Sequence, residues 1–137
     1  MLSLEEINDR IEIIDMLHRY AGAIDAGEWD VLDTVFTPDA PIDYSAMGGA
    51  SLPFGEMKPW LESMISHVPG RMHLISNIQV AFSSDRKTAT STAYLMNAMV
   101  FSPDNTTLIG GVYNDSLVRT TDGWRVRERR LDMVWKS

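Results

Sequence analysis

The residues with the clearest chemical potential are an aspartate and a histidine that lie far apart in the sequence. Asp25 falls at the carboxyl end of a predicted helix, where the helix dipole disfavours an anion, one turn after Ala21 on the apolar side. His73 stands in an apolar run that is typical of a strand. A carboxylate bound to one imidazole nitrogen fixes the tautomer and leaves the other nitrogen free to take a proton from carbon. Such a pair would be a general base.

Each of these residues also has a purely structural interpretation. Asp25 could cap the turn formed by Ala26 and Gly27, and a lone histidine in an apolar run is more often a satisfied core or surface residue. Tyr44, Tyr113 and Asn114 are equally ambiguous, because tyrosine is a normal strand residue and asparagine suits a bulge or an edge. The residue types alone leave a binding pocket and an ordinary core as alternatives.

The composition limits the fold and the partners. A chain of 137 residues with 45% hydrophobic content suits one domain over residues 1–137 with one core. The 19 acidic residues against 12 basic ones give a formal charge of -7, which disfavours nucleic acid as a partner. Without cysteine the chain has neither a disulfide nor a thiolate nucleophile.

Neither a metal nor a membrane is expected as a partner. The histidines His18, His67 and His73 show no metal-ligand spacing, and a proton-transfer role needs no cofactor. The first residues are acidic and lack the order of a signal peptide, and no apolar run approaches the length of a membrane span. We therefore expect a cytoplasmic protein that uses no metal and no cofactor.

Helical patterning occupies the first half of the chain. Ser3 and Glu6 form a plausible capping box at the start of the first apolar repeat. A second, shorter repeat ends before Thr37-Pro38, since the residue before a proline disfavours the helical conformation. We expect helices at about residues 3–26, 29–36 and 56–67, and a short extended segment at 41–44 followed by a loop rich in Gly, Ala and Ser.

Strand patterning fills the second half. Four runs rich in Val, Ile, Thr, Tyr and Leu are separated by turn residues such as Asp122-Gly123. The absence of βαβ repetition predicts an α+β layer pair, with helices on an antiparallel sheet. We expect long strands at about residues 72–82, 88–101, 107–120 and 124–135.

Alternation along these strands predicts which side chains share a face. If His73 faces inward, Asn77 shares its side and Ile78 faces the other. Tyr113 and Asn114 cannot both face inward in a regular strand, and a bulge near Gly110-Gly111 would decide between them.

The order of elements and several motifs resemble the SnoaL-like group of the nuclear-transport-factor-2-like (NTF2-like) superfamily. The resemblance covers nearly the whole chain. It implies an α+β cone, with three N-terminal helices packed on a curved antiparallel sheet of one short and four long strands, and a pocket between them. The motifs are Ala23–Leu32 with its helix-end aspartate, Ile42-Asp43-Tyr44, Arg71-Met72-His73, Gly110–Asp115 and the hairpin Asp122–Arg125.

Two enzyme families of this group imply roles for single residues. Scytalone dehydratase is similar at Asp25, Tyr44, His73 and Asn114; in that family tyrosines orient a water on the substrate carbonyl and a histidine removes a proton before water is lost. Hexachlorocyclohexane dehydrochlorinase is similar at its Asp–His base dyad and at Arg129, which there assists the leaving halide. The resemblance favours Asn114 over Tyr113 as the residue that faces the pocket.

The sequence also departs from both families. No histidine lies near Asn97 to Met99, where the dehydratase has a second one, and Ile24 replaces a tyrosine. Tyr20 stands where the dehydrochlorinase has a lysine. The catalytic pair is expected to be His73 and Asp25, and the substrate-binding residues Tyr20, Tyr44, Tyr113, Asn114 and Arg129.

Two classes of function remain. A cofactor-independent lyase or isomerase, acting on a small, largely apolar cyclic or oxygenated molecule, would use the Asp–His pair as its base. A non-catalytic ligand-binding or assembly module, including the small subunit of a ring-hydroxylating oxygenase, would keep the cone without proton transfer. The nine methionines are either core filler or a soft pocket lining. In either case an exposed face of the sheet would favour association into a homodimer or homotrimer.

Overall fold

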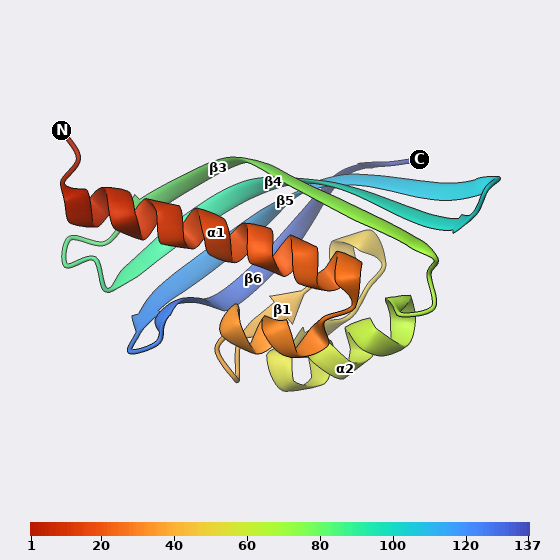
Figure 1. The fold of residues 1–137 in the computed structure, drawn as a ribbon, viewed down its shortest axis with the longest axis horizontal. Coiled ribbons are helices and arrows are strands. Elements are labelled where there is room, and N and C mark those ends of the chain that lie inside the picture. The colour runs from red at the N-terminus through yellow and green to blue at the C-terminus, as the bar shows by residue number, and fades with distance from the viewer.

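The computed structural model describes all of residues 1–137 and confirms the α+β cone. A long helix crosses one face of a curved sheet, and shorter elements close one end (Figure 1). In chain order the elements are α1 (Leu4–Ala26), the 3-10 helix η1 (Trp29–Thr34), β1 (Pro41–Asp43), the 3-10 helix η2 (Ser45–Met47), β2 (Ser51–Pro53), α2 (Phe54–Ile65), β3 (Gly70–Phe82), β4 (Thr88–Ser102), β5 (Asn105–Thr120) and β6 (Gly123–Lys136).

The short elements differ from the prediction. The second helix is a single 3-10 segment, η1, and two short strands occur where one was expected. The additional strand, β2, lies in the segment predicted to be a Gly-, Ala- and Ser-rich loop, and it pairs antiparallel with β1. Three-residue strands are too short for an alternation signal. The four long strands are confirmed, within three residues of the expected bounds.

The strands form one sheet in the order β2-β1-β6-β5-β4-β3. Consecutive long strands pair antiparallel as hairpins, whereas β1 lies parallel to β6 with Ile42 opposite Arg129. This parallel contact brings the segment after η1 beside the last strand, so residues from the first and last thirds of the chain meet. Helix α2 follows β2 and packs against β1, β2 and η1 at this end of the sheet (Figure 1).

Helix α1 begins and ends with defined caps. The Ser3 hydroxyl accepts a hydrogen bond from the amide of Glu6 at 3.1 Å, which satisfies one free donor of the first turn. At the other end Gly27 has φ 72°, a left-handed conformation that glycine adopts without strain, and its amide caps carbonyls of the last turn. The helix therefore ends at Ala26, one residue after Asp25, and the chain turns toward η1.

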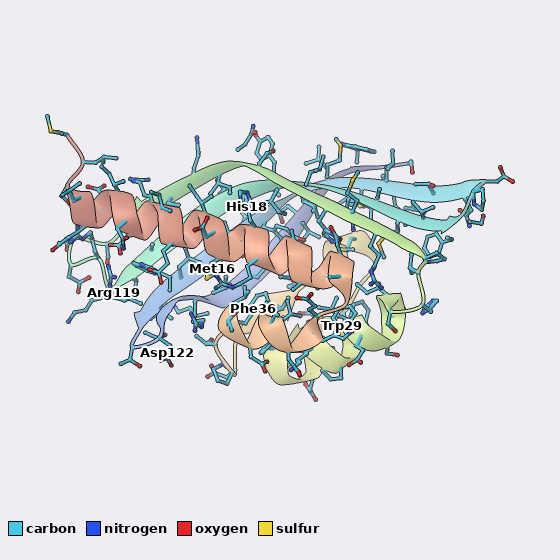
Figure 2. The ribbon with its side chains drawn as sticks, viewed as in Figure 1. Met16, His18, Trp29, Phe36, Arg119 and Asp122 are labelled. Carbon is cyan, nitrogen blue, oxygen red and sulfur yellow. The ribbon has the colours of Figure 1, made fainter.

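The core fills the space between α1 and the sheet. Met16 from α1 and Phe36 after η1, both labelled in Figure 2, are almost fully buried in it. Trp124 and Leu117 close it from the sheet side. Phe36 stacks on Phe54 with ring centroids 5.1 Å apart, which fixes the start of α2 against the segment after η1.

A bulge in β3 reverses the predicted facing of two residues. The register with β4 shifts between Ser76 and Gln79, and Asn77 has φ 51°. Asn77 is therefore exposed, and Ile78 packs against the core, although strict alternation from His73 predicted the opposite. The expectation for these two residues is wrong because one extra residue in a strand exchanges its faces beyond that point.

No helix in the structure has both the length and the hydropathy that crossing a membrane requires.

Candidate active site

The structure brings Asp25 and His73 together where the end of α1 meets β3. His73 Nδ1 lies 2.6 Å from Asp25 Oδ1, and the backbone amide of His73 donates to Asp25 Oδ2 at 2.8 Å. Both carboxylate oxygens are thus bound by one residue, which fixes the carboxylate plane relative to the ring. The two residues are 48 positions apart in sequence, so only the packing of α1 on β3 creates the pair.

Arg71 holds the end of α1 in place. Its guanidinium donates to the backbone carbonyl of Asp25 from Nη2 at 3.1 Å and from Nε at 3.3 Å, and to the carbonyl of Ile65 from Nη1 at 2.7 Å. A cation at a helix C-terminus satisfies free carbonyls and complements the helix dipole. One side chain from β3 therefore ties α1 and α2 together beside the pair.

The Asp25 carboxyl group is ionised at neutral pH. Burial raises its pKa, but the hydrogen bonds from the ring and backbone of His73 lower it by more, and the net pKa lies below the ordinary value. The carboxylate accepts a hydrogen bond from the N–H at Nδ1, and this tautomer of the imidazole leaves Nε2 as the free nitrogen. The His73 side chain is only 6% exposed, and it borders a cavity.

That cavity lies between α1, α2 and the sheet and is almost entirely apolar. Its volume is about 90 Å³. An engineered cavity of about 150 Å³ holds benzene, so a single ring enters here only when lining side chains move aside. The half-buried Met47 and Met99 are unbranched and adapt at low cost. The lining consists of Tyr20, Ile24, Tyr44, Met47, Trp60, Leu61, Ile65, His73, Leu95, Asn97, Met99, Ile109 and Tyr113.

Three tyrosines from separate elements line the cavity. The hydroxyl groups of Tyr20 and Tyr44 share a hydrogen bond of 2.7 Å, and the ring of Tyr113 packs edge-on against Tyr20 with centroids 5.8 Å apart. Burial raises the pKa of all three well above the ordinary value. The phenols therefore stay protonated, and in the Tyr20–Tyr44 pair one O–H remains available as a donor. The structure places these three predicted binding residues at the cavity.

Arg129 lies behind the tyrosines and does not line the cavity. It forms a bidentate ion pair with Asp115, from Nε and Nη2 at 2.8 Å each, and its side chain is fully buried. Its guanidinium stacks on the ring of Tyr113 at 3.9 Å and on that of Tyr20 at 4.4 Å. The structure therefore corrects the expectation that Arg129 touches the substrate. The physical reason is its partner, since Asp115 stands directly opposite it in the β5–β6 ladder.

The Arg129 guanidinium stays charged. Burial lowers the pKa of Arg129, but the charge and hydrogen bonds of Asp115, together with the neighbouring tyrosines Tyr44 and Tyr20, raise it by more, so the guanidinium remains a cation. The Nη1 atom of Arg129 is buried without a hydrogen-bond partner. The guanidinium end of this ion pair faces the rings of Tyr20 and Tyr113, while Asp115 offsets its charge.

Asn114 points away from the cavity. Its side-chain amide donates to Asp132 at 2.9 Å on the outer face of the sheet, whereas Tyr113 occupies the inward position. The bulge at Gly110–Gly111 lies before both residues, and regular alternation from there sends Tyr113 inward. The preference for Asn114 over Tyr113 as the inward residue is therefore wrong.

Asn97 is a cavity residue that the sequence-based list of site residues missed. It lies directly opposite His73 in the β3–β4 ladder, is 4% exposed and lines the cavity. An asparagine in an apolar strand has no spacing signal of its own. The family resemblance pointed to the region of Asn97 to Met99 only as the place of a missing histidine. The cross-strand pairing with His73 identifies Asn97 itself, and that register depends on the length of the hairpin.

The two other histidines do not contribute to the site. His18, labelled in Figure 2, is exposed on α1, and His67 is exposed after α2. The structure contains no group of three or more His, Cys, Asp or Glu side chains placed to hold a metal ion.

Comparisons with known proteins identify relatives over nearly the whole chain. The uncharacterized protein Rv2910c of Mycobacterium tuberculosis (strain ATCC 25618 / H37Rv) is 43% identical over 131 residues, which are 94% of this chain and 88% of the relative. A candidate scytalone dehydratase from Novosphingobium aromaticivorans DSM 12444 has a similar structure, with a TM-score of 0.85, 20% identity and coverage of 96% of this chain and 87% of the other.

A hexachlorocyclohexane dehydrochlorinase, LinA type 2, has a TM-score of 0.84 at 16% identity, covering 98% of this chain and 90% of the other. At these identities the two structures show a common fold. The model of the SnoaL-like domain matches residues 5–130. This chain therefore belongs to the SnoaL-like family of NTF2-like proteins.

Proposed function

We propose that the protein is a lyase or isomerase that removes a proton from carbon in a small, largely apolar cyclic or oxygenated molecule. The observation that carries this proposal is the bond between Asp25 and Nδ1 of His73, which leaves Nε2 free beside an apolar cavity. A nitrogen base held in one tautomer in a dry pocket meets the geometric requirement for general base catalysis.

The step uses only side chains of this chain. Nε2 of His73 takes a proton from a carbon next to a carbonyl, and Asp25 stabilises the imidazolium that forms. The free O–H of the Tyr20–Tyr44 pair donates to the carbonyl oxygen, where negative charge develops. In an isomerisation the proton returns to another carbon. In an elimination the electron pair expels a neighbouring group, and the proton on His73 joins a leaving hydroxide as water.

The comparisons support this class of reaction without naming a substrate. One structural neighbour is described as a candidate scytalone dehydratase and another as a dehydrochlorinase, and both names describe eliminations. Fold similarity alone does not transfer an activity. The proposal therefore depends on the arrangement of Asp25 and His73 in this chain.

The test measures proton abstraction directly. The protein is incubated in deuterium oxide with a panel of cyclic ketones, hydroxylated aromatics and halogenated rings, and deuterium incorporation and elimination products are followed by NMR. We expect exchange or elimination with at least one compound, and His73→Ala and Asp25→Asn to lower its rate by about a hundredfold to ten-thousandfold.

The matched control is His18→Ala, which removes an exposed histidine from α1 and should leave the rate unchanged. Circular dichroism and ligand binding verify that the slow variants remain folded. A fully active His73→Ala protein would rule out the base and favour a ligand-binding module.

We also propose that a second copy of the chain covers the outer face of the sheet. Large apolar side chains are exposed on that face and at its end, among them Tyr94, Met96, Met133, Val134 and Trp135. A homodimer or homotrimer would bury them. Light scattering after size exclusion measures the mass, and a monomer at all concentrations would contradict this proposal.

A further inference from the structure

The position of Asn97 makes it the cross-strand neighbour of the proposed base. Asn97 in β4 is directly opposite His73 in β3, and directly opposite residues on one sheet face have Cβ atoms about 5 Å apart. Both side chains line the same cavity. A molecule bound in this cavity can therefore contact both side chains.

The amide of Asn97 is not satisfied within the protein. The residue is 4% exposed, and its side-chain carbonyl oxygen is buried without a hydrogen-bond partner. Native structures pair nearly all buried polar atoms, because an unpaired one costs the full desolvation penalty of the group. Leucine would fill this position without that penalty, so the asparagine is retained at a cost to stability.

The surroundings define what would satisfy it. The inward neighbours of Asn97 along β4 are Leu95 and Met99, and Ile109 stands opposite it on β5, so none offers a donor side chain. A carbonyl oxygen needs a donor, and the amide nitrogen beside it needs an acceptor. A hydroxyl group supplies both, whereas a hydrocarbon or a halogen supplies no donor.

We propose that Asn97 is a specificity-determining residue that binds a hydroxyl group of the substrate beside the carbon that His73 deprotonates. This inference deepens the proposed function, and it rests on that function for the identity of the site. It names the substrate class as small hydroxylated rings, in preference to hydrocarbon or halogenated rings of the same shape.

The test compares phenol with toluene, two ring-sized probes that differ by a hydroxyl and a methyl group. Dissociation constants are measured by NMR titration for the full chain and for Asn97→Leu, which keeps the branched shape and the number of side-chain heavy atoms. The ratio of the toluene constant to the phenol constant should fall by about tenfold in the variant, the effect of one hydrogen bond. The melting temperature of Asn97→Leu should equal or exceed that of the wild type, because an unpaired polar atom is removed.

The matched control is Asn114→Leu, which changes an asparagine on the opposite face of the sheet and should leave the ratio unchanged. An unchanged ratio in Asn97→Leu, a marked loss of its stability, or a wild type that binds neither probe would overturn the inference. The deuterium-exchange experiment separates this inference from the proposed function. If no compound exchanges deuterium but the phenol preference still depends on Asn97, the proton-transfer proposal fails and the hydroxyl site remains.

Discussion

Helix α1 carries an aspartate near each end, and the two have opposite surroundings. Asp9 is 2% exposed and accepts hydrogen bonds from Arg119 at 2.6 and 3.0 Å and from the indole nitrogen of Trp124 at 3.2 Å. Asp25 is bound by His73 alone among side chains, and its surroundings open into a cavity. Both carboxylates are ionised and paired, so pairing alone does not identify a site.

The difference lies in the partners of each carboxylate and in the polar atoms that border a cavity. At the Asp9 end every polar atom of the aspartate has a partner, and the guanidinium of Arg119 also covers the ring of Trp124 at 4.7 Å. At the Asp25 end the free imidazole nitrogen and the carbonyl oxygen of Asn97 have none. A satisfied network stabilises a fold, whereas unsatisfied polar atoms around a cavity are typical of a binding site.

The largest expected effect is on stability at the Asp9 end. Asp9→Ala removes two charge-assisted hydrogen bonds and leaves the indole N–H of Trp124 buried without a partner. We expect the free energy of unfolding to fall by about 3 kcal/mol. Urea denaturation at pH 7 measures it, with Asp15→Ala as the control, since Asp15 is exposed on the same helix. An equal loss in Asp15→Ala would show that the effect does not come from the hydrogen bonds of Asp9.

Acidification should weaken both ends of α1. The pKa of Asp9 is lowered chiefly by its hydrogen bond with Arg119, and that of Asp25 by its bonds with His73, which outweigh burial. A carboxyl group with a lower pKa in the folded chain stabilises the fold above its unfolded pKa, and this contribution is lost as the pH falls through the folded pKa. The urea midpoint should therefore decrease below pH 4, and less steeply in a variant with Asp9→Asn and Asp25→Asn. An equal decrease of the urea midpoint with pH in the two proteins would show that this acid sensitivity does not come from Asp9 and Asp25.

The turn after Asp25 should respond to a single methyl group. Gly27→Ala forces a left-handed conformation on a residue with a side chain, and the added carbon would lie 3.3 Å from the guanidinium of Arg71. We expect a loss of about 1–2 kcal/mol in the free energy of unfolding. Gly22→Ala is the control, because a side chain there meets no atom within 4 Å and α1 favours alanine. An unchanged free energy of unfolding in Gly27→Ala would show that the turn can rearrange.

The smallest expected effect on stability is that of Asp25→Asn. A quarter of the Asp25 side chain is exposed, and the amide can still bind the backbone N–H of His73 through its oxygen. We expect a change below about 1 kcal/mol. The amide nitrogen then faces Nδ1 of His73 as a donor and selects the tautomer protonated at Nε2, which cannot act as a base. An Asp25→Asn protein that keeps its stability but no longer catalyses deuterium exchange would sharpen the contrast with Asp9. A loss of stability as large as that of Asp9→Ala would remove the contrast.

The sequence predicted the long elements because they contain enough residues for a periodic signal. The first helix and the four long strands were recognisable from apolar spacing and turn residues. The facing of Asn77 and Ile78 was not, since a bulge leaves no periodic trace and reverses the alternation beyond it.

The candidate site was only partly predictable for the same reason. Asp25 and His73 were found through their residue types and the family resemblance. Asn97 was missed, because its significance comes from cross-strand register. Arg129 was misplaced, because the inward-facing Asp115 that binds it was not considered as a partner.

Because α1 carries both aspartates, its length is constrained between them in a way that other segments are not. One residue inserted between positions 9 and 25 would rotate one carboxylate about 100° around the helix axis and shift it about 1.5 Å along it. Either the anchor at Arg119 or the pair with His73 would then be lost. The exposed β4–β5 turn near Pro103 has no such dependence. Natural insertions and engineered tags should therefore be tolerated at that turn and excluded from the middle of α1.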